Sequence, residues 1–300
     1  MNYVYPRFSA HSVFGMRIGG AGLGNLLFMY ARAFHFARVH DCRMIWPLWK
    51  SIKLGPWLRH EKDKRFYGDL FRNNSGYIDG SERRRLLRRS RLVREEAFDS
   101  AADGQVVVFD RYIMDFSYFA DSRDALHDAL IRNLQEKNRR ALCFDFGDAI
   151  GVHIRLGDFT PADPRSLASG ANNMSIPVSW YADVIRRVRA LTGEGRPAYV
   201  FSDGSDEALR EVLALPNVER ITFGTSIADI LALSRTKLLI ASGSTFSSWA
   251  RFLGGMTAIG YKKQLKCHGL CAAGNAELEI LSPDEIQELL VAEQGDQPDE

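Results

Sequence analysis

The chain has 300 residues, of which 46% are hydrophobic and 25% are charged, as expected for a globular protein with a large core. Its 39 basic and 37 acidic residues nearly balance, which disfavours a general nucleic-acid-binding protein. The four cysteines are too few for a disulfide framework and favour a reducing compartment. Because the N-terminus lacks a signal-peptide pattern and no long apolar run follows, the sequence predicts a cytoplasmic protein, with two domains at 1–145 and 146–300.

A glycine-rich turn opens the first domain. A strand is predicted over 12–18, the turn over 19–25, and a helix with one apolar stripe after it. The dinucleotide-binding pattern G-x-G-x-x-G fails here, because Asn25 occupies the position of its third glycine. The phosphate-loop pattern also fails, because Asn25 occupies the position of its lysine. The bare backbone around Gly24 and the Asn25 side chain are therefore predicted to face a ligand at a helix N-terminus. Close packing of the helix on the strand is the alternative.

The stretch 41–103 is less regular, with a short strand predicted within 44–49. Trp46, Trp49 and Trp57 are suited to stacking on sugar rings, although core packing is the commoner role of such residues. Residues 82–94 contain seven arginines and one glutamate, with three leucines and a valine between them. This pattern is typical of a helix on an anionic membrane surface or an acidic acceptor, and equally of a solvated helix that packs its leucines inward.

Strands and helices alternate from residue 105 onward. A buried strand is predicted over 105–109 and a helical connector over 122–140. The second domain is predicted to contain strands at 151–154, 198–201, 220–223, 238–240 and 257–261, and helices near 178–191, 206–215, 227–234, 247–252 and 283–293. This alternation predicts an α/β fold with a doubly wound parallel sheet.

Polar clusters follow three of the predicted strands. They are His153, Arg155 and Asp158 after the first strand, Asp203 after the second, and Ser244, Thr245 and Phe246 after the fourth. Because the carboxyl ends of parallel strands share one edge of a sheet, these clusters are predicted to converge on one crevice. The Arg155 guanidinium and the hydroxyls before a helix suit phosphate, and Asp203 suits a nucleobase edge or a ribose. A surface Arg155–Asp158 salt bridge and simple helix capping are the alternatives.

A cysteine and histidine cluster lies near the C-terminus. Cys267, His268 and Cys271 have the residue types of a zinc site. The two-residue spacer of common zinc knuckles is absent and no second ligand pair follows, so no metal is predicted.

Four segments, in order, resemble the motifs of bacterial α-1,2-fucosyltransferases. They are G-G-A-G-L-G-N-L-L-F-M-Y-A at 19–31, G-V-H-I-R-L-G-D-F at 151–159, F-S-D-G at 201–204 and S-G-S-T-F-S-S-W-A at 242–250. The resemblance implies a GT-B architecture, in which two Rossmann-like doubly wound domains face a cleft, the N-terminal one binding the acceptor and the C-terminal one GDP-fucose. Two positions depart from the pattern. Leu156 stands where a second arginine is common, and Gly204 where a second acid is usual.

The resemblance also implies roles for individual residues. Arg155 would hold the β-phosphate of the donor with His153 beside it, and Asp203 would lie near the guanosine. Ser244, Thr245 and Phe246 would surround the diphosphate and base, and Asn25 would approach the diphosphate from the facing domain. Arg155 with backbone donors would stabilise the leaving diphosphate without a metal ion. An acceptor hydroxyl would attack with inversion, with Asp158 as the candidate base.

The function implied is transfer of L-fucose from GDP-fucose to a hydroxyl of a glycan, a galactoside-type oligosaccharide or polysaccharide precursor, in an α-1,2 linkage. No cofactor, metal ion or nucleic acid is expected. One alternative is a GT-B transferase that uses another nucleotide sugar, and the other is a non-catalytic nucleotide- or glycan-binding module. A dehydrogenase is disfavoured because the dinucleotide pattern fails. The arginine-rich segment leaves peripheral contact with the inner membrane face open.

Overall fold

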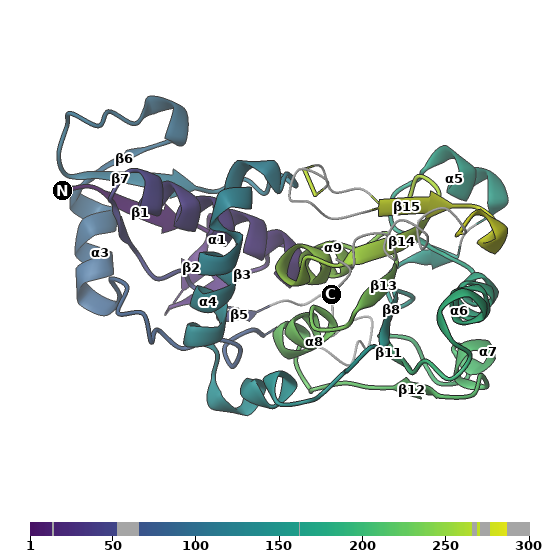
Figure 1. The fold of residues 1–300 in the computed structure, drawn as a ribbon. Coiled ribbons are helices and arrows are strands. Elements are labelled where there is room, and N and C mark those ends of the chain that lie inside the picture. Colours follow the sequence, from purple (N-terminus) through teal and green to yellow (C-terminus); the bar gives the residue numbers. More distant parts are fainter. Residues whose placement is uncertain (14, 53–65, 162, 266–268, 271–276, 287–300) are drawn as a thin grey trace, which may run out of the picture. The chain divides into compact units, whose positions relative to one another are not determined.

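The computed structural model describes residues 1–13, 15–52, 66–161, 163–265, 269–270 and 277–286 (Figure 1). The chain divides into two units, Met1–Arg139 and Arg140–Glu300. Each unit contains a parallel sheet, so the predicted α/β class is confirmed. Trp57 and the cluster of Cys267, His268 and Cys271 lie outside the described residues.

Unit 1 is built on a four-stranded parallel sheet in the order β4-β1-β7-β6. These strands are Arg43–Met44, Tyr3–Pro6, Gln105–Phe109 and Arg91–Val93. Its helical segments are α1 (Leu23–Val39), α3 (Gly80–Arg89), η1 (Glu95–Ala97), η2 (Ser117–Ser122) and α4 (Arg123–Asn133). The 3-10 segment η3 (Glu136–Leu142) crosses the boundary between the two units. The fully buried strand β7 has the bounds predicted from its run of valines.

The prediction of a single strand over residues 12–18 is wrong. This segment is a small antiparallel hairpin of β2 (Ser12–Val13) and β3 (Met16–Ile18), and β5 (Ser51–Ile52) runs beside β3. Gly15 has φ of 76°, a conformation that favours glycine, and it reverses the chain between β2 and β3. The glycine turn therefore follows a hairpin, and the first strand of the main sheet is β1. The strand predicted within 44–49 is only the two residues of β4.

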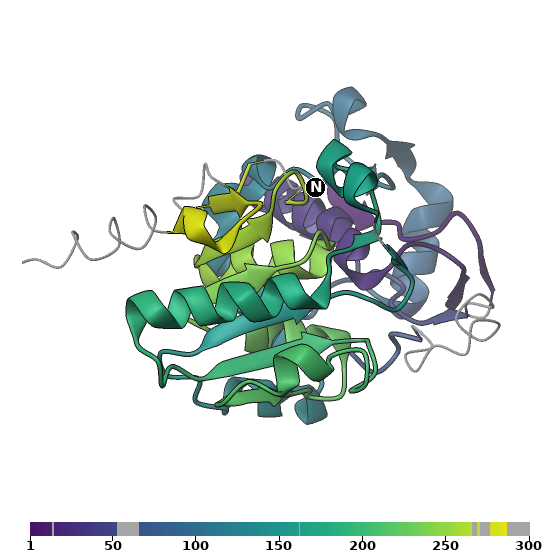
Figure 2. The same ribbon diagram turned by 90° about the vertical axis from the view of Figure 1, so that its right-hand side faces the viewer.

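Unit 2 contains a six-stranded parallel sheet in the order β12-β11-β8-β13-β14-β15 (Figure 2). Its strands are Val218–Arg220, Ala198–Ser202, Ile150–Ile154, Leu238–Ala241, Thr257–Tyr261 and Glu277–Ile280. The other elements are β9 (Thr160–Pro161), α5 (Pro164–Ser169), β10 (Met174–Ser175), α6 (Val178–Thr192), α7 (Arg210–Leu213), α8 (Ser226–Leu233), α9 (Thr245–Gly254) and η5 (Pro283–Ile286).

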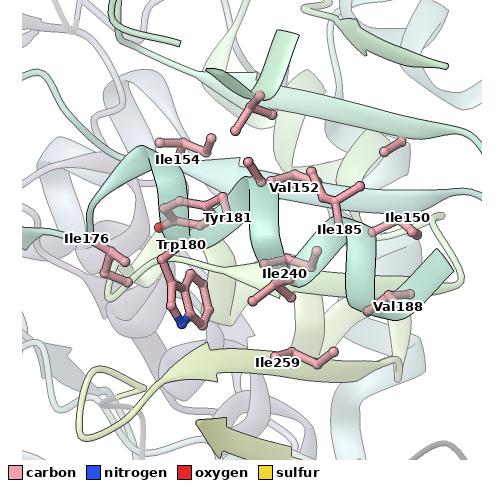
Figure 3. Close-up of a cluster of buried hydrophobic side chains, with 14 of the residues drawn as sticks. Ile150, Val152, Ile154, Ile176, Trp180, Tyr181, Ile185, Val188, Ile240 and Ile259 are labelled. Atoms are coloured by element: carbon pink, nitrogen blue, oxygen red, sulfur yellow. The ribbon is translucent and has the colours of Figure 1, made fainter. Parts of the chain in front are cut away.

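Helices cover both faces of this sheet, as a doubly wound fold requires. Successive strand residues point to opposite faces, so each central strand contributes to two apolar layers. One layer joins β8, β13 and β14 to α6 (Figure 3), through Ile150, Val152, Ile154, Ile240, Ile259, Trp180, Tyr181, Ile185 and Val188. The other layer joins Leu239, Ala241 and Ala258 to α8 and α9. Each fully buried aliphatic side chain contributes about 1.5–3 kcal/mol to this core.

Two elements at the margins of unit 2 differ from prediction. The edge strand β15 was not expected, because its sequence Glu-Leu-Glu-Ile lacks the continuous apolar run of the central strands. The helix predicted over 206–215 is only the four residues of α7, preceded by turns over 206–209. The helix predicted over 283–293 is described only as far as Ile286, where it is a 3-10 turn.

Candidate active site at the carboxyl edge of the unit 2 sheet

The predicted polar clusters surround the point where the strand order of unit 2 reverses. From β8 the chain moves outward to β11 and β12, and then returns to the other side of β8 to form β13. The parallel register aligns Ile154 with Ser202 and Val152 with Ile240. The loops after β8, β11 and β13 therefore leave the same edge, where open α/β sheets bind their ligands.

Arg155, directly after β8, lies between two carboxylates. Its Nε and Nη2 donate to Oδ1 of Asp158 at 3.1 and 2.5 Å, and its Nη1 lies 2.7 Å from Oδ2 of Asp203. The guanidinium also lies 5.7 Å from the ring centroid of Phe159. One hydrogen on each Nη has no acceptor among the residues that the structure describes, and the Arg155 side chain is 25% exposed. The Arg155–Asp158 salt bridge, which was the alternative to an anion site, is therefore present, and Asp203 is a second partner of Arg155.

Asp203 connects the loop after β11 to the loop after β8. Besides its ion pair with Arg155, it accepts the Leu156 N–H at 2.9 Å through Oδ1. A Cβ added at Gly157 would lie 2.3 Å from Asp203 Oδ2, so a larger residue there would displace this carboxylate. The sequence suggested two roles for Asp203, contact with a nucleoside and capping of the following helix. It did not predict that Asp203 links the two loops. Strand order created this link, because β8 and β11 are neighbours.

The two departures from the motif pattern touch each other. Leu156 packs against the apolar layer of unit 2, and a Cβ at Gly204 would lie 2.5 Å from Leu156 Cδ1. Gly204 thus leaves the space that the Leu156 side chain fills. The two residues that depart from the expected motif pattern therefore lie in contact range of each other.

His153 is buried on β8, at 4% exposure, beneath this edge. Its Nδ1 lies 2.6 Å from Ser247 Oγ and 2.9 Å from Ser242 Oγ, and its ring stacks on Phe246 with centroids 4.5 Å apart. Burial lowers the pKa of His153 to about 3; Asp203 opposes this shift and Arg155 adds to it. The imidazole is therefore neutral at physiological pH. It fixes the start of α9 against β8 and carries no charge for a ligand.

The helix α9 begins at the same edge of the sheet. Ser244 is its N-cap and accepts the Phe246 N–H at 3.2 Å, while Thr245 and Phe246 in the first turn are half-buried. No acidic residue occupies the first turn, so the N-terminus keeps its positive potential. Ser242 and Ser247 are engaged with His153. The serine-rich segment thus both caps the helix and anchors it, and it places backbone N–H groups at the edge.

The predicted site residues of the glycine turn belong to unit 1. Gly24 and Asn25 lie in the first turn of α1 and are half-buried. Beneath the turn lies Arg17, which is buried at 1% exposure and which the sequence analysis missed. Its position next to a glycine-rich turn is a signal that could have drawn attention to it. In the described part of the chain, no three His, Cys, Asp or Glu side chains gather as a metal site would require.

Comparison with known proteins agrees with this architecture. The E. coli heptosyltransferase WaaC with ADP superposes with a TM-score of 0.50, at 10% identity, over 97% of this chain and 99% of that chain. Fucosyltransferase NodZ from Bradyrhizobium gives 0.48 at 16% identity, over 84% and 93% of the two chains. A point mutant of FUT1 from Arabidopsis thaliana, in complex with GDP, gives 0.47 at 13% identity, over 87% and 70%.

Two parallel-sheet α/β units, with a charged site at a strand-order reversal, define a GT-B glycosyltransferase fold. The family model of glycosyl transferase family 11 matches residues 108–264, more than half of the chain. The chain therefore belongs to glycosyl transferase family 11, a family of fucosyltransferases. No curated protein matches the chain at a significant level.

Proposed function

We propose that this protein transfers L-fucose from GDP-fucose to a hydroxyl of a galactoside-type glycan, with inversion and in an α-1,2 linkage. Membership of glycosyl transferase family 11 supports fucose transfer. The observation that carries the site assignment is Arg155, held at the strand-order reversal by Asp158 and Asp203 with donors to spare. This is the charge and geometry that a departing diphosphate requires.

In the proposed reaction, the site residues have different tasks. Cleavage of the bond between fucose and GDP develops negative charge on the diphosphate, and Arg155 with the N–H groups at the start of α9 stabilises it. Asp203 and Asp158 fix the guanidinium so that it need not reorganise during the reaction. His153 holds the start of α9 and is a positioning residue. Ser244, Thr245 and Phe246 bring that helix N-terminus to the donor.

Two groups are candidates to receive the acceptor proton. Asp158 is the candidate from the sequence, but its Oδ1 accepts two N–H groups of Arg155, which weakens it as a base. We therefore assign Asp158 to the orientation of Arg155. With inversion the diphosphate leaves from the face of the sugar opposite to the attacking hydroxyl, so the acceptor proton passes to water and reaches the departing phosphate oxygen only through solvent. In this mechanism Arg155 stabilises the charge that a divalent ion stabilises elsewhere, and no metal ion takes part.

The decisive test compares nucleotides by calorimetric titration in EDTA. We expect GDP to bind more tightly than UDP or ADP, and GDP-fucose to be turned over without metal. NMR of the product with a galactoside acceptor then reports the linkage and the anomeric configuration. Preference for another nucleotide would replace the donor assignment, whereas GDP binding with no turnover on any glycan would favour a binding module.

We also propose that the basic face of α3 binds an anionic membrane surface. Leu86 and Leu87 of α3 pack against the core layer around Tyr5, whereas four exposed arginines occupy the opposite side of the helix, namely Arg84, Arg85, Arg88 and Arg89. Arg91 and the exposed Leu92 follow in β6, and Arg94 comes directly after it. Cations around an exposed apolar side chain suit a lipid headgroup layer. Among the described residues, no helix combines the length and hydrophobicity of a membrane span.

Vesicle binding tests this surface. We expect the wild type to sediment with phosphatidylglycerol vesicles at low salt, and Arg84→Gln, Arg85→Gln, Arg88→Gln and Arg89→Gln together to weaken binding by about a hundredfold or more, because each cation contributes about 1 kcal/mol. The matched control removes four exposed arginines elsewhere, at Arg72, Arg165, Arg186 and Arg210. Equal losses in both variants, or tighter binding to duplex DNA than to vesicles, would contradict a membrane-binding face.

A further inference from the structure

Arg220 is the last residue of β12, the edge strand of the unit 2 sheet. Arg155 follows β8, and β11 lies between these two strands (Figure 1). Arg220 is outside the four segments that resemble family motifs, and its side chain is 26% exposed. A half-buried cation at a strand end needs fixed hydrogen-bond acceptors or an acid beside it, and Arg220 has both.

The guanidinium of Arg220 holds the backbone of the loop after β11. Its Nη2 donates to the Gly204 carbonyl at 2.8 Å and to the Ser202 carbonyl at 3.1 Å. Its Nη1 forms an ion pair with Asp206. Ser202 and Gly204 are the residues on either side of Asp203, so one planar group fixes the carbonyls of the residues before and after this carboxylate.

The two bonds to carbonyls are the stronger part of this arrangement. Gly204 is buried, so its carbonyl needs a hydrogen-bond donor from within the protein. Asp206 is 77% exposed, and an ion pair with such an acid contributes little to stability. An exposed acid would be satisfied by any cation, whereas two carbonyls and an acid together need the fixed fork of an arginine. Arg220 therefore acts mainly on the backbone of the loop.

The position of this backbone decides where the Asp203 carboxylate lies. Asp203 has a short side chain with two rotatable bonds, which cannot compensate for a displaced backbone. Its Oδ1 accepts the Leu156 N–H at 2.9 Å, and its Oδ2 lies 2.7 Å from Arg155 Nη1. The loop packs closely against the loop after β8, since a Cβ at Gly204 would lie 2.5 Å from Leu156 Cδ1. Displacement of the loop backbone would therefore release both contacts of Asp203.

We propose that Arg220 is a positioning residue of the active site, which holds Asp203 in place and thereby orients Arg155. The proposal rests on the proposed function, in which Arg155 binds the diphosphate of the donor. A guanidinium that stabilises developing charge is most effective when the groups that hold it are themselves rigid. Arg220 supplies that rigidity from a strand that does not border β8.

Amide hydrogen exchange at Leu156 tests this link without a ligand. The Leu156 N–H donates to Asp203 and belongs to the loop after β8, whereas the hydrogen bonds of Arg220 are to the loop after β11. We expect Arg220→Met and Asp203→Ala each to speed this exchange about tenfold or more. The reason is that one variant loosens the acceptor of the Leu156 N–H and the other removes it.

Two control variants separate this role from a loss of charge. Arg210→Met removes an exposed arginine that begins α7, shortly after the same loop, and pairs with Glu207 at 2.8 Å. Asp206→Asn removes the ion pair of Arg220 but leaves its bonds to the two carbonyls. We expect Leu156 exchange in both variants to stay within about twofold of the wild-type rate.

A double-mutant cycle on GDP affinity tests the route through Asp203. Calorimetric titration compares the wild type, Arg220→Met, Asp203→Ala and the double variant. We expect each single variant to bind GDP about tenfold more weakly, because Arg155 is less well oriented toward the diphosphate. The double variant should bind no more weakly than Asp203→Ala alone, since Arg220 acts through Asp203. A residue that stabilises only the fold would lower the melting temperature and leave GDP affinity unchanged.

Exchange of Leu156 at the wild-type rate in a folded Arg220→Met protein would overturn the proposal, and so would losses of GDP affinity that add in the double variant. If Arg220→Met does not fold, Arg220→Lys takes its place, because lysine keeps the charge beside Asp206 but lacks the planar fork. Leu156 exchange should again be faster than in the wild type, and an unchanged rate would exclude the role. A wild type that binds no GDP would contradict the proposed function, whereas Leu156 exchange still decides whether Arg220 positions Asp203.

Discussion

Replacing Arg155 by methionine is expected to lower kcat/KM with GDP-fucose by about a hundred- to a thousandfold. Removal of one donor from a site that stabilises developing charge has an effect of this size. Methionine keeps the length and apolar stem of the side chain but supplies no hydrogen to the diphosphate. Steady-state kinetics measures the loss, and we expect much of it in kcat, because the charge on the diphosphate grows as the bond to fucose breaks.

The control for this prediction is Arg186→Met. Arg186 is an exposed arginine of α6 that pairs with Asp183 at 2.6 Å, so its loss removes the same charge from unit 2 away from the sheet edge. We expect its kinetics to match the wild type. Because Arg155→Met leaves Asp158 and Asp203 without their shared cation, its melting temperature is measured alongside. Turnover unchanged in a folded Arg155→Met protein would remove Arg155 from the reaction.

The second large effect is a pH dependence of stability that originates at His153. The folded protein keeps this group neutral because its pKa is lowered from 6.5 to about 3, chiefly by burial. Below pH 6.5 the unfolded chain binds a proton that the native state does not bind, so stability falls as the pH falls, with a slope that approaches about 1.4 kcal/mol per pH unit. Between about pH 6.5 and 4.5 this one group lowers the stability of the wild type by about 2 kcal/mol.

Urea unfolding of the wild type and His153→Leu at several pH values measures this contribution. At neutral pH we expect the variant to be less stable by about 1–3 kcal/mol, because the Ser242 and Ser247 hydroxyls lose the imidazole nitrogen. On acidification its stability should decrease less steeply than that of the wild type. Replacement of the exposed His11 by leucine is the control. Parallel pH profiles for wild type and His153→Leu would show that His153 is not held neutral.

Another buried group works in the opposite direction, which is why the comparison with a variant is needed. Burial raises the pKa of Asp229 from 3.8 to about 6, although the Phe223 N–H and the Thr222 hydroxyl favour its ionised form. The native state therefore binds a proton between about pH 6 and 3.8 that the unfolded state does not bind, and stability rises as the pH falls through that window. Asp229 contributes equally to the stability of the wild type and of His153→Leu, so its contribution cancels when the two stabilities are subtracted at each pH.

Much of unit 2 could be predicted from the sequence. The strand at 257–261 has the predicted bounds, as does the strand at 105–109 in unit 1, and α6 and α8 lie within about two residues of theirs, because long apolar runs and helical periodicity act over short distances. Prediction failed where tertiary context decides the structure. The hairpin at 12–18 depends on β5 beside it, and the edge strand β15 depends on hydrogen bonds to β14.

The sequence by itself determined that strands and helices alternate and which polar residues end the strands, since both follow from local composition. Only the tertiary structure decided that β8 lies between β11 and β13, because strand order depends on crossover connections. That order gives Arg155 its second carboxylate from Asp203 and places His153 between Ser242 and Ser247. Likewise, the sequence shows that Arg17 lies beside a glycine turn. Only the tertiary structure shows that Arg17 is buried without an acid partner among the described residues, because burial depends on how the whole chain packs.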